Sequence, residues 1–327
     1  MFSRRSFISS ASALAALVTP LSKAWAQAWP SRPIKFVVPL TPGGANDYLA
    51  RLFSERLQSV LGQPVVVENK PGVGGNIGTE YVAKQAADGY TLLISSNTHV
   101  INVNFFSKLP YDPIKDFEPV SMVGSIPFIM TVNASTPVTT LKEFIAMAKA
   151  KPGTVTYGTA GIGTPHHLAA EQLKSLAGIE MTHVPYKGAA GIVPALLASE
   201  ITVTIGAINS LLPHIRSGKL RPIAIAAANR TAILPDVPTM AEAGPFPGLS
   251  MDVWFAVLAP AGTPRAIIDR YNTEINKMLR DPQLVKDKLT PVGIEATGTT
   301  PERCMEMLKA DLAKYIKVAK DANIRPE

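Results

Sequence analysis

Apolar positions along the chain follow two periods, one typical of strands and one typical of helices. A β-branched run at 34–38 and a second at 65–67 have the spacing of buried strands, and Leu49, Leu52 and Leu57 between them share one face of a helix. The same alternation continues, with strands predicted at 90–94, 155–157, 181–184, 201–205 and 221–226 and helices ending near 106, 150, 176, 197 and 216. Thr140 with Glu143 predicts a capping box for the helix that ends near 150, and Asn76 is expected to cap a short helix after the second strand. This order of elements predicts an α/β fold.

A turn rich in proline and glycine joins the first predicted strand to its helix. Gly43 and Gly44 allow positive φ angles and a close approach to a bound group, and Asn46 or Asp47 is expected to cap the helix. The N–H groups of a first helical turn point back toward such a turn, so it favours an anion. A plain tight connection is the alternative.

The same arrangement recurs in the second half of the chain. The strand at 155–157 runs into a glycine turn at 158–163, where Thr164 is the expected N-cap and Pro165 the first helical residue. Strand ends at Ser96, at 69–78 and near Tyr186 are also small, polar or glycine-rich. Because the carboxyl ends of parallel strands share one edge of a sheet, a ligand site is expected there.

Two long extended stretches interrupt the alternation of strands and helices. The first covers 119–123 and 127–132, and the second covers 249–258. We interpret them as two crossings between domains, which would form a hinge. The domains are predicted as 27–126 plus 251–327 for the first and 127–250 for the second.

The N-terminus has the pattern of an export signal. Arg4 and Arg5 precede an apolar stretch, and Ala24-Trp25-Ala26 fits the small-x-small rule for cleavage after Ala26. The arginine pair followed by Ser6 is similar to a twin-arginine signal, and an ordinary secretory leader remains the alternative. We expect the mature protein to be periplasmic, since no later run approaches the roughly 20 apolar residues that span a bilayer.

Charge and cysteine content narrow the function classes. Removal of residues 1–26 takes away Arg4, Arg5 and Lys23 and no acid, so the formal net charge falls from +7 to +4. The basic residues are dispersed, which argues against a nucleic-acid partner. Cys304 is the only cysteine of the 327 residues, so an internal disulfide is excluded, and its helical setting predicts a buried, inert thiol.

Enzyme signatures are absent from the sequence. It contains no G-x-S-x-G, no phosphate-binding loop of the G-x-x-x-x-G-K-[ST] type and no H-E-x-x-H. His166 and His167 diverge by about 100° on a helix, which argues against a shared metal. His166 either donates to an anionic ligand or is a solvated surface residue. Lys187 either faces the ligand or is a solvated turn lysine, and Arg51 is expected to hold a carboxylate structurally.

These motifs give the chain a family resemblance. In order and spacing, the chain resembles the Bug family of extracytoplasmic solute receptors, the binding components of tripartite tricarboxylate transporters. The motifs are Pro39-x-x-Pro42-Gly43-Gly44-x-x-Asp47, Glu68-Asn69-Lys70-Pro71-Gly72, Tyr157-Gly158-Thr159-Ala160-Gly161-Ile162-Gly163-Thr164-Pro165-His166, Val184-Pro185-Tyr186-Lys187-Gly188, Leu212-Pro213-His214-Ile215 and Ala259-Pro260-Ala261-Gly262-Thr263-Pro264. The resemblance covers the whole mature chain.

The resemblance implies a two-domain periplasmic binding protein of type II-like architecture, each domain a mostly parallel sheet flanked by helices, with a ligand cleft between them. Such receptors are monomers and not enzymes, need no cofactor, and deliver a small carboxylate to membrane permease subunits. The expected ligand-binding residues are Pro42, Gly43, Gly44, Asn46, Asp47, Ser96, Asn97, Thr98, Thr159, Gly161, Gly163, Thr164, His166, Tyr186, Lys187 and Asn209. A receptor coupled to a sensor protein, or a secreted hydrolase or lyase, is the alternative function.

The sequence departs from the family pattern at two positions. Thr202 and Gly206 stand where the family often carries acids. Because a buried ammonium needs an acceptor, the absence of acids there predicts a mono- or dicarboxylate ligand without an amino group. The alternative is that both positions lie outside the cleft and do not affect specificity.

Overall fold

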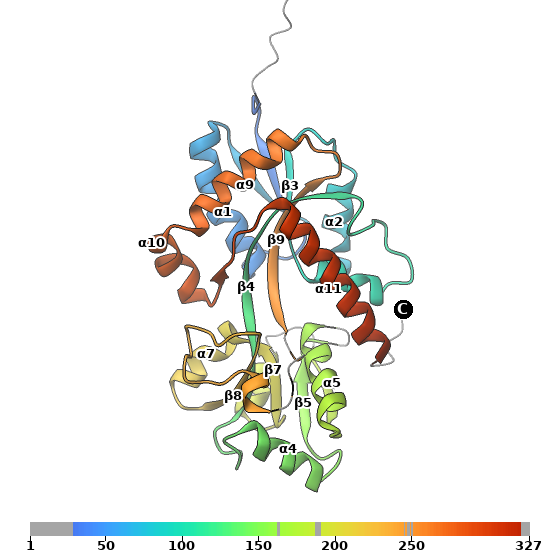
Figure 1. Ribbon diagram of the computed structural model, residues 1–327, viewed down its shortest axis with the longest axis vertical. Coiled ribbons are helices and arrows are strands. Elements are labelled where there is room, and N and C mark those ends of the chain that lie inside the picture. The colour runs from blue at the N-terminus through green and yellow to red at the C-terminus, as the bar shows by residue number, and fades with distance from the viewer. Residues whose placement is uncertain are drawn as a thin grey trace, which may run out of the picture.

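The computed structural model describes residues 29–161, 164–186, 191–244, 246, 249 and 251–321. Figure 1 shows an upper and a lower lobe, with strands β4 (Phe117–Asn133) and β9 (Asp252–Pro260) running between them. The two runs predicted at 119–123 and 127–132 are thus one strand of 17 residues. None of the helices among the described residues is long and apolar enough to cross a membrane.

The upper lobe combines both ends of the described chain. Its elements are β1 (Ile34–Val38), α1 (Ala45–Leu61), β2 (Val65–Asn69), η1 (Val73–Gly75), α2 (Asn76–Ala83), β3 (Thr91–Ser96), α3 (Thr98–Ile101), η2 (Asn102–Asn104), α9 (Arg265–Leu279), α10 (Pro282–Leu284), η4 (Val285–Leu289), η5 (Thr290–Val292), β10 (Glu295–Ala296) and α11 (Pro301–Asp321). The strand order here is β2-β1-β3-β9-β4, with β10 also paired to β4.

The lower lobe is built from the middle of the chain. Its elements are α4 (Leu141–Ala150), β5 (Thr156–Thr159), α5 (Pro165–Ala177), β6 (Thr182–Pro185), α6 (Ile192–Leu197), β7 (Val203–Ala207), α7 (Ile208–Arg216), β8 (Leu220–Ala226) and α8 (Met240–Ala243). Here β4 pairs with both β7 and β8, and β5 lies between β7 and β6. The predicted α/β class with helices flanking a sheet is confirmed.

The sheet is mixed, which corrects the expectation of mostly parallel sheets. Strands β1, β2 and β3 are parallel to one another, and so are β5, β6 and β7. Every pairing made by β4 or β9 is antiparallel. The reason is topological. The chain crosses between the lobes along β4 and returns along β9, so these two strands run in opposite directions.

The strand registers show where the parallel strands point. In the upper lobe, Ser96 at the carboxyl end of β3 pairs with Phe255, close to the pair Pro127–Asp252 at which β4 leaves β9. In the lower lobe, Ala207 at the carboxyl end of β7 pairs with Phe128, the next residue of β4. The parallel strands of both lobes therefore run toward the same crossing.

Two apolar clusters fill the two faces of the sheet, and each extends through both lobes. In the lower part of β4, Phe128, Met130 and Val132 belong to one cluster, whereas Ile129 between them belongs to the other. Alternating side chains of this strand are thus buried on both faces. Helices α2, α11, α4 and α5 cover the first face, and α1, α9, α6 and α7 cover the second.

The N-terminal ends of the helices can be compared with the capping residues predicted from the sequence. The capping box of Thr140 and Glu143 at the start of α4 is present as predicted, and Thr164 and Pro165 occupy the N-cap and first position of α5. Elsewhere the capping predictions are wrong. Gly75, not Asn76, is the N-cap of α2, because the Asn76 amide oxygen instead accepts hydrogen bonds from Asn102 and Tyr111.

The buried, inert thiol predicted for Cys304 is confirmed. Its side chain lies on the buried face of α11, and this burial raises the pKa of the thiol to about 12.

Candidate functional site

The first glycine turn lies at the carboxyl end of β1 and leads into α1. Gly44 is the N-cap of this 17-residue helix, so the prediction that Asn46 or Asp47 is the cap is wrong. Gly43 has a φ of +88°, which a side chain would strain, and Gly44 has an ordinary extended backbone. Pro42, Gly43 and Gly44 are exposed, and no atom lies within 4 Å of a Cβ added at either glycine. The turn is open to an incoming group.

Asp47 is occupied within its own helix. Arg51 donates from Nε to Oδ2 and from Nη2 to Oδ1, each at 2.9 Å, and the Gly43 N–H donates to Oδ2 at 3.1 Å. The hydrogen bond from Arg51 in particular holds the pKa of Asp47 below its usual range. The structural role predicted for Arg51 is confirmed, and the Gly43 N–H is already paired.

The carboxyl end of β3 supplies a second group of polar residues beside this turn. Asn46 donates to the Ile94 carbonyl at 3.3 Å, which ties α1 to β3, and the hydroxyls of Ser96 and Thr98 lie 3.1 Å apart. Asn97 is fully buried and donates to the carbonyl of Asp252, the first residue of β9, at 2.7 Å. Asn97 therefore ties the strand end to the crossing.

The second glycine turn lies at the carboxyl end of β5 and leads into α5. The Thr159 hydroxyl is buried and accepts from the Gly161 N–H at 3.2 Å, while the Thr164 hydroxyl donates to the Gly161 carbonyl at 2.7 Å. Thr164 therefore uses its side chain to close the turn and makes no side-chain hydrogen bond to the first turn of α5. Gly163 lies outside the described residues.

The starts of α1 and α5 share one property. Neither N-cap residue, Gly44 or Thr164, accepts a side-chain hydrogen bond from the helix it opens, which is also the case at the starts of α2, α6, α7 and α9. By contrast, Thr140 and Thr239 close the starts of α4 and α8 with capping boxes. An uncapped start leaves N–H donors of the first turn for another acceptor, and the helix dipole favours one that is negatively charged.

His166 lies in the first turn of α5, and the alternative of a solvated surface residue is wrong. Its ring packs against Phe128 with centroids 4.7 Å apart, and its Nδ1 is enclosed with no hydrogen-bond partner. This burial lowers the pKa of His166 to about 4, so the imidazole is neutral. Thr204, Gly206 and Ser210 line a cavity of about 10 Å³ beside it, roughly the room of one water molecule.

The remaining predicted residues have varied positions. The Tyr186 ring packs over β5 and α6, since a Cβ added at Gly158 or Gly191 would contact it. Asn209 lies in the first turn of α7 and contacts Gly293 of the upper lobe, where an added Cβ would come within 3.0 Å of it. Lys187 lies outside the described residues. Tyr186 thus belongs to the packing of the lower lobe, and Asn209 to the contact between the lobes.

The two positions that depart from the family pattern lie at opposite ends of β7. Thr202 exchanges hydrogen bonds with Thr156 at the amino ends of β7 and β5, away from the crossing. Gly206 lies near the carboxyl end, and an added Cβ would approach the His166 ring at 3.1 Å. Only Gly206 therefore adjoins the candidate site.

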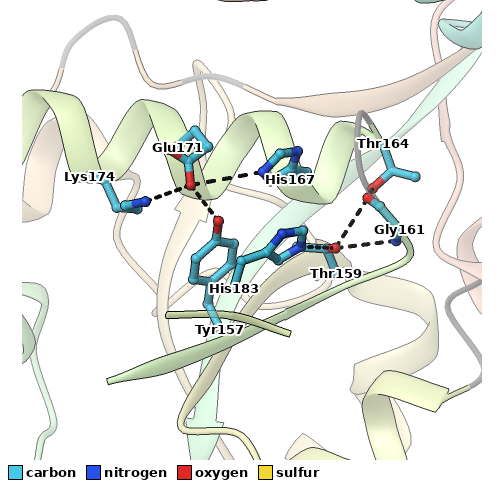
Figure 2. A network of polar contacts seen from close by, with 8 residues as sticks. All are labelled: Tyr157, Thr159, Gly161, Thr164, His167, Glu171, Lys174 and His183. Carbon is cyan, nitrogen blue, oxygen red and sulfur yellow. Dashed lines mark hydrogen bonds and ion pairs between the residues drawn. The ribbon is translucent and has the colours of Figure 1, made fainter. Parts of the chain in front are cut away.

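A network of polar and aromatic residues that the sequence did not predict supports the second turn (Figure 2). The rings of Tyr157, His183 and His167 are stacked, with His167 and His183 4.3 Å apart at their centroids and nearly parallel. His183 Nε2 lies 2.7 Å from the Thr159 hydroxyl. The network thus joins α5, β5 and β6 directly behind the turn.

Glu171 of α5 carries the charge of this network. Tyr157 and Lys174 donate to its carboxylate. Burial acts to raise the pKa of Glu171, but these hydrogen bonds outweigh it and lower the pKa. Burial also lowers the pKa of His167, to about 4, and that of His183. A neutral pair of imidazoles beside an ionised glutamate follows.

The two-lobed mixed sheet, with glycine turns at the strand ends that meet at the crossing, is the architecture of solute-binding proteins of the periplasmic type. The model of the "Tripartite tricarboxylate transporter family receptor" matches residues 49–324, and the chain belongs to this family, whose receptors are periplasmic and are not enzymes.

Relatives and solved structures agree with this assignment. Protein BugT of Bordetella pertussis is 37% identical over 315 residues, which cover 96% of this chain and 95% of that protein. The structure of R. palustris Rpa4515 with adipate is 38% identical, with a TM-score of 0.80, covering 91% of this chain and 100% of that one. MatC from Rhodopseudomonas palustris, with bound malate, is 30% identical with a TM-score of 0.73, covering 88% and 99%.

Proposed function

We propose that this chain is a receptor that captures a small dicarboxylate between its two lobes and delivers it to the permease of a tripartite tricarboxylate-type transporter. The bound protein would present the ligand to membrane subunits that recognise the closed form. A soluble, exported monomer with its signal cleaved after Ala26 fits this role.

The observation that carries the proposal is the pair of uncapped helix starts. Gly44 is the N-cap of α1 in one lobe and Thr164 is the N-cap of α5 in the other, and each ends the turn that follows a parallel strand running toward the crossing. Each N-terminus is equivalent to about half a positive charge. A ligand with a carboxylate at each end would satisfy both.

The contacts would come mainly from the backbone. The Gly43 N–H and the Gly161 N–H are already paired with Asp47 and Thr159, so we infer that the donors are the amides that follow them. Ser96, Thr98 and His166 would add side-chain hydrogen bonds at the edges. The proposed ligand-binding segments are therefore 42–46, 96–98 and 159–166.

The ligand class follows from charge and from the relatives. The solved structures of two relatives contain adipate and malate, both dicarboxylates without an amino group. In the first turn Asp47 is held by Arg51, and Gly206 provides no carboxylate beside His166. An amino group on the ligand would have no carboxylate to accept its hydrogen bonds, and burial of an unpaired ammonium costs free energy of binding.

Closure about the two crossings would bring the helix starts together on the ligand. We propose that residues 27–126 plus 251–327 move as one domain and 127–250 as the other. The change of β4 partner from β9 to β7 and β8 between Pro127 and Phe128 supports a hinge at that point.

Native mass spectrometry of the gently purified, exported protein tests the proposal. We expect an added mass that matches a dicarboxylate and is released unchanged on denaturation. The matched control is Gly44→Val purified in the same way, which should carry none. Conversion of an added dicarboxylate into a product would refute the receptor function in favour of an enzyme.

A further inference from the structure

The hydroxyl of Thr159 is the centre of the turn that opens α5. Its oxygen lies 3.2 Å from the Gly161 N–H, 3.2 Å from the Gly161 carbonyl and 2.7 Å from Nε2 of His183 (Figure 2). The Gly161 carbonyl also accepts from the Thr164 hydroxyl. The peptide groups of Gly161 are thus held from both sides by two threonine side chains.

The hydrogen atoms available around the Thr159 hydroxyl determine whether His183 donates or accepts in this contact. A threonine hydroxyl has one hydrogen to donate and can accept two hydrogen bonds. The Gly161 N–H must donate to it, and the Gly161 carbonyl can only accept from it. All three contacts are satisfied together only when His183 Nε2 carries a proton and donates to Thr159.

The stacked rings fix His183 in the orientation that this bond needs. Its imidazole lies nearly parallel to the rings of Tyr157 and His167, at centroid distances of 4.9 and 4.3 Å, and those two rings are themselves 6.4 Å apart. Tyr157 is itself anchored through its hydroxyl to Glu171. Two close aromatic neighbours leave the imidazole little room to rotate, so its Nε2 stays directed at Thr159.

We propose that His183 is a positioning residue for ligand binding, which acts through the Thr159 hydroxyl to hold the Gly161 turn in its ligand-binding conformation. The inference rests on the proposed function and adds a residue that contacts no ligand itself. Loss of the His183 donor frees the Thr159 hydroxyl to rotate away from the Gly161 carbonyl. The turn then loses its fixed geometry, and the start of α5 loses its preorganised donors.

Three variants of the exported chain test the inference: His183→Leu, Thr159→Val and His183→Gln. Leucine keeps apolar bulk in the stack without a donor, valine removes only the hydroxyl, and glutamine restores an N–H donor. Two quantities are measured in each, the dissociation constant for adipate and malate by calorimetry and the hydrogen exchange of the Gly161 amide by NMR. Urea unfolding reports global stability.

We expect His183→Leu and Thr159→Val to weaken dicarboxylate binding by about tenfold or more and to speed Gly161 exchange, and His183→Gln to restore both. Unchanged affinity in the first two variants overturns the inference while leaving the receptor function intact. A fall in affinity that follows global stability, with no rescue by glutamine, also overturns it, because the role is then structural. If the parent chain binds no carboxylate, the proposed function fails and this inference fails with it.

Discussion

Arg51 holds both oxygens of the Asp47 carboxylate from one turn further along α1, with two hydrogen bonds of 2.9 Å. The same carboxylate accepts from the Gly43 N–H, so one ion pair fixes the start of the helix and the turn before it. Asp47 is 4% exposed and already accepts three hydrogen bonds, so a ligand ammonium group has little access to it. The ion pair therefore disfavours ligands that carry an amino group.

The first prediction concerns that choice. In a thermal-shift panel, succinate, glutarate and adipate should raise the melting temperature, whereas aspartate and glutamate should have little effect, because their ammonium groups find no carboxylate acceptor. Each amino acid is compared with its des-amino analogue of the same length. Stabilisation by the amino acids alone would show that the site supplies an acceptor we have not identified.

A second prediction separates binding from folding. Gly44→Val should fold normally, because the Gly44 backbone suits any residue and no atom lies within 4 Å of the new Cβ. The branched side chain should nevertheless cover the first turn of α1. We expect dicarboxylate affinity to fall at least about tenfold in calorimetry, with a cooperative melt retained.

Gly178→Val is the matched control at the other end of a site helix. Gly178 also has open space around it but has a φ of +60° at the end of α5, so a side chain there strains the backbone. Stability should fall by roughly 1–2 kcal/mol with affinity retained. Equal affinity of Gly44→Val and the parent would remove α1 from the site.

A third prediction concerns domain closure. Small-angle scattering should show a smaller radius of gyration with saturating dicarboxylate than without it, since only a closed form lets α1 and α5 contact one ligand. Gly44→Val in the same buffer should show no change. Identical profiles for the parent with and without ligand would indicate a rigid receptor.

A fourth prediction follows from three buried histidines. Burial lowers the pKa values of His99, His166 and His167 to about 4, against about 6.5 in an unfolded chain. Between these values the unfolded chain binds more protons, so stability is fully present above pH 6.5 and decreases as the pH falls toward 4. Each histidine contributes up to about 1.4 kcal/mol per pH unit.

Urea unfolding at pH 7.5 and pH 5.0 measures this dependence. His99→Phe should reduce the difference between the two pH values, although its absolute stability also falls because the Pro113 carbonyl loses its partner. A free energy of unfolding that is equal at both pH values would contradict the assigned histidine burial.

Local signals in the sequence predicted much of the fold. The Thr140–Glu143 capping box and the Thr164–Pro165 helix start depend on residues next to one another and are present as expected. The single strand β4 was predicted as two runs, 119–123 and 127–132. Gly124 lies in the gap between them, and the reason for a glycine there is a distant contact. An added Cβ there would lie 2.8 Å from the Glu295 carbonyl of β10.

The site was less predictable, because its key contacts join distant parts of the chain. Thr159 was identified from its glycine turn, but its partner His183 lies 24 residues away on a neighbouring parallel strand. That contact depends on the pairing of β5 with β6, which periodicity does not specify. Thr202 was misjudged for the same reason, because only the register shows that it lies at the far end of β7.

The central claim is that two helix starts hold the two carboxylates of one ligand. Calorimetric titration of the exported protein with adipate and with its dimethyl ester tests it most directly, since the ester keeps the length and removes both charges. We predict one adipate bound per chain and no measurable binding of the ester. Equal binding of acid and ester, or failure of every dicarboxylate in the panel to bind, would contradict the claim.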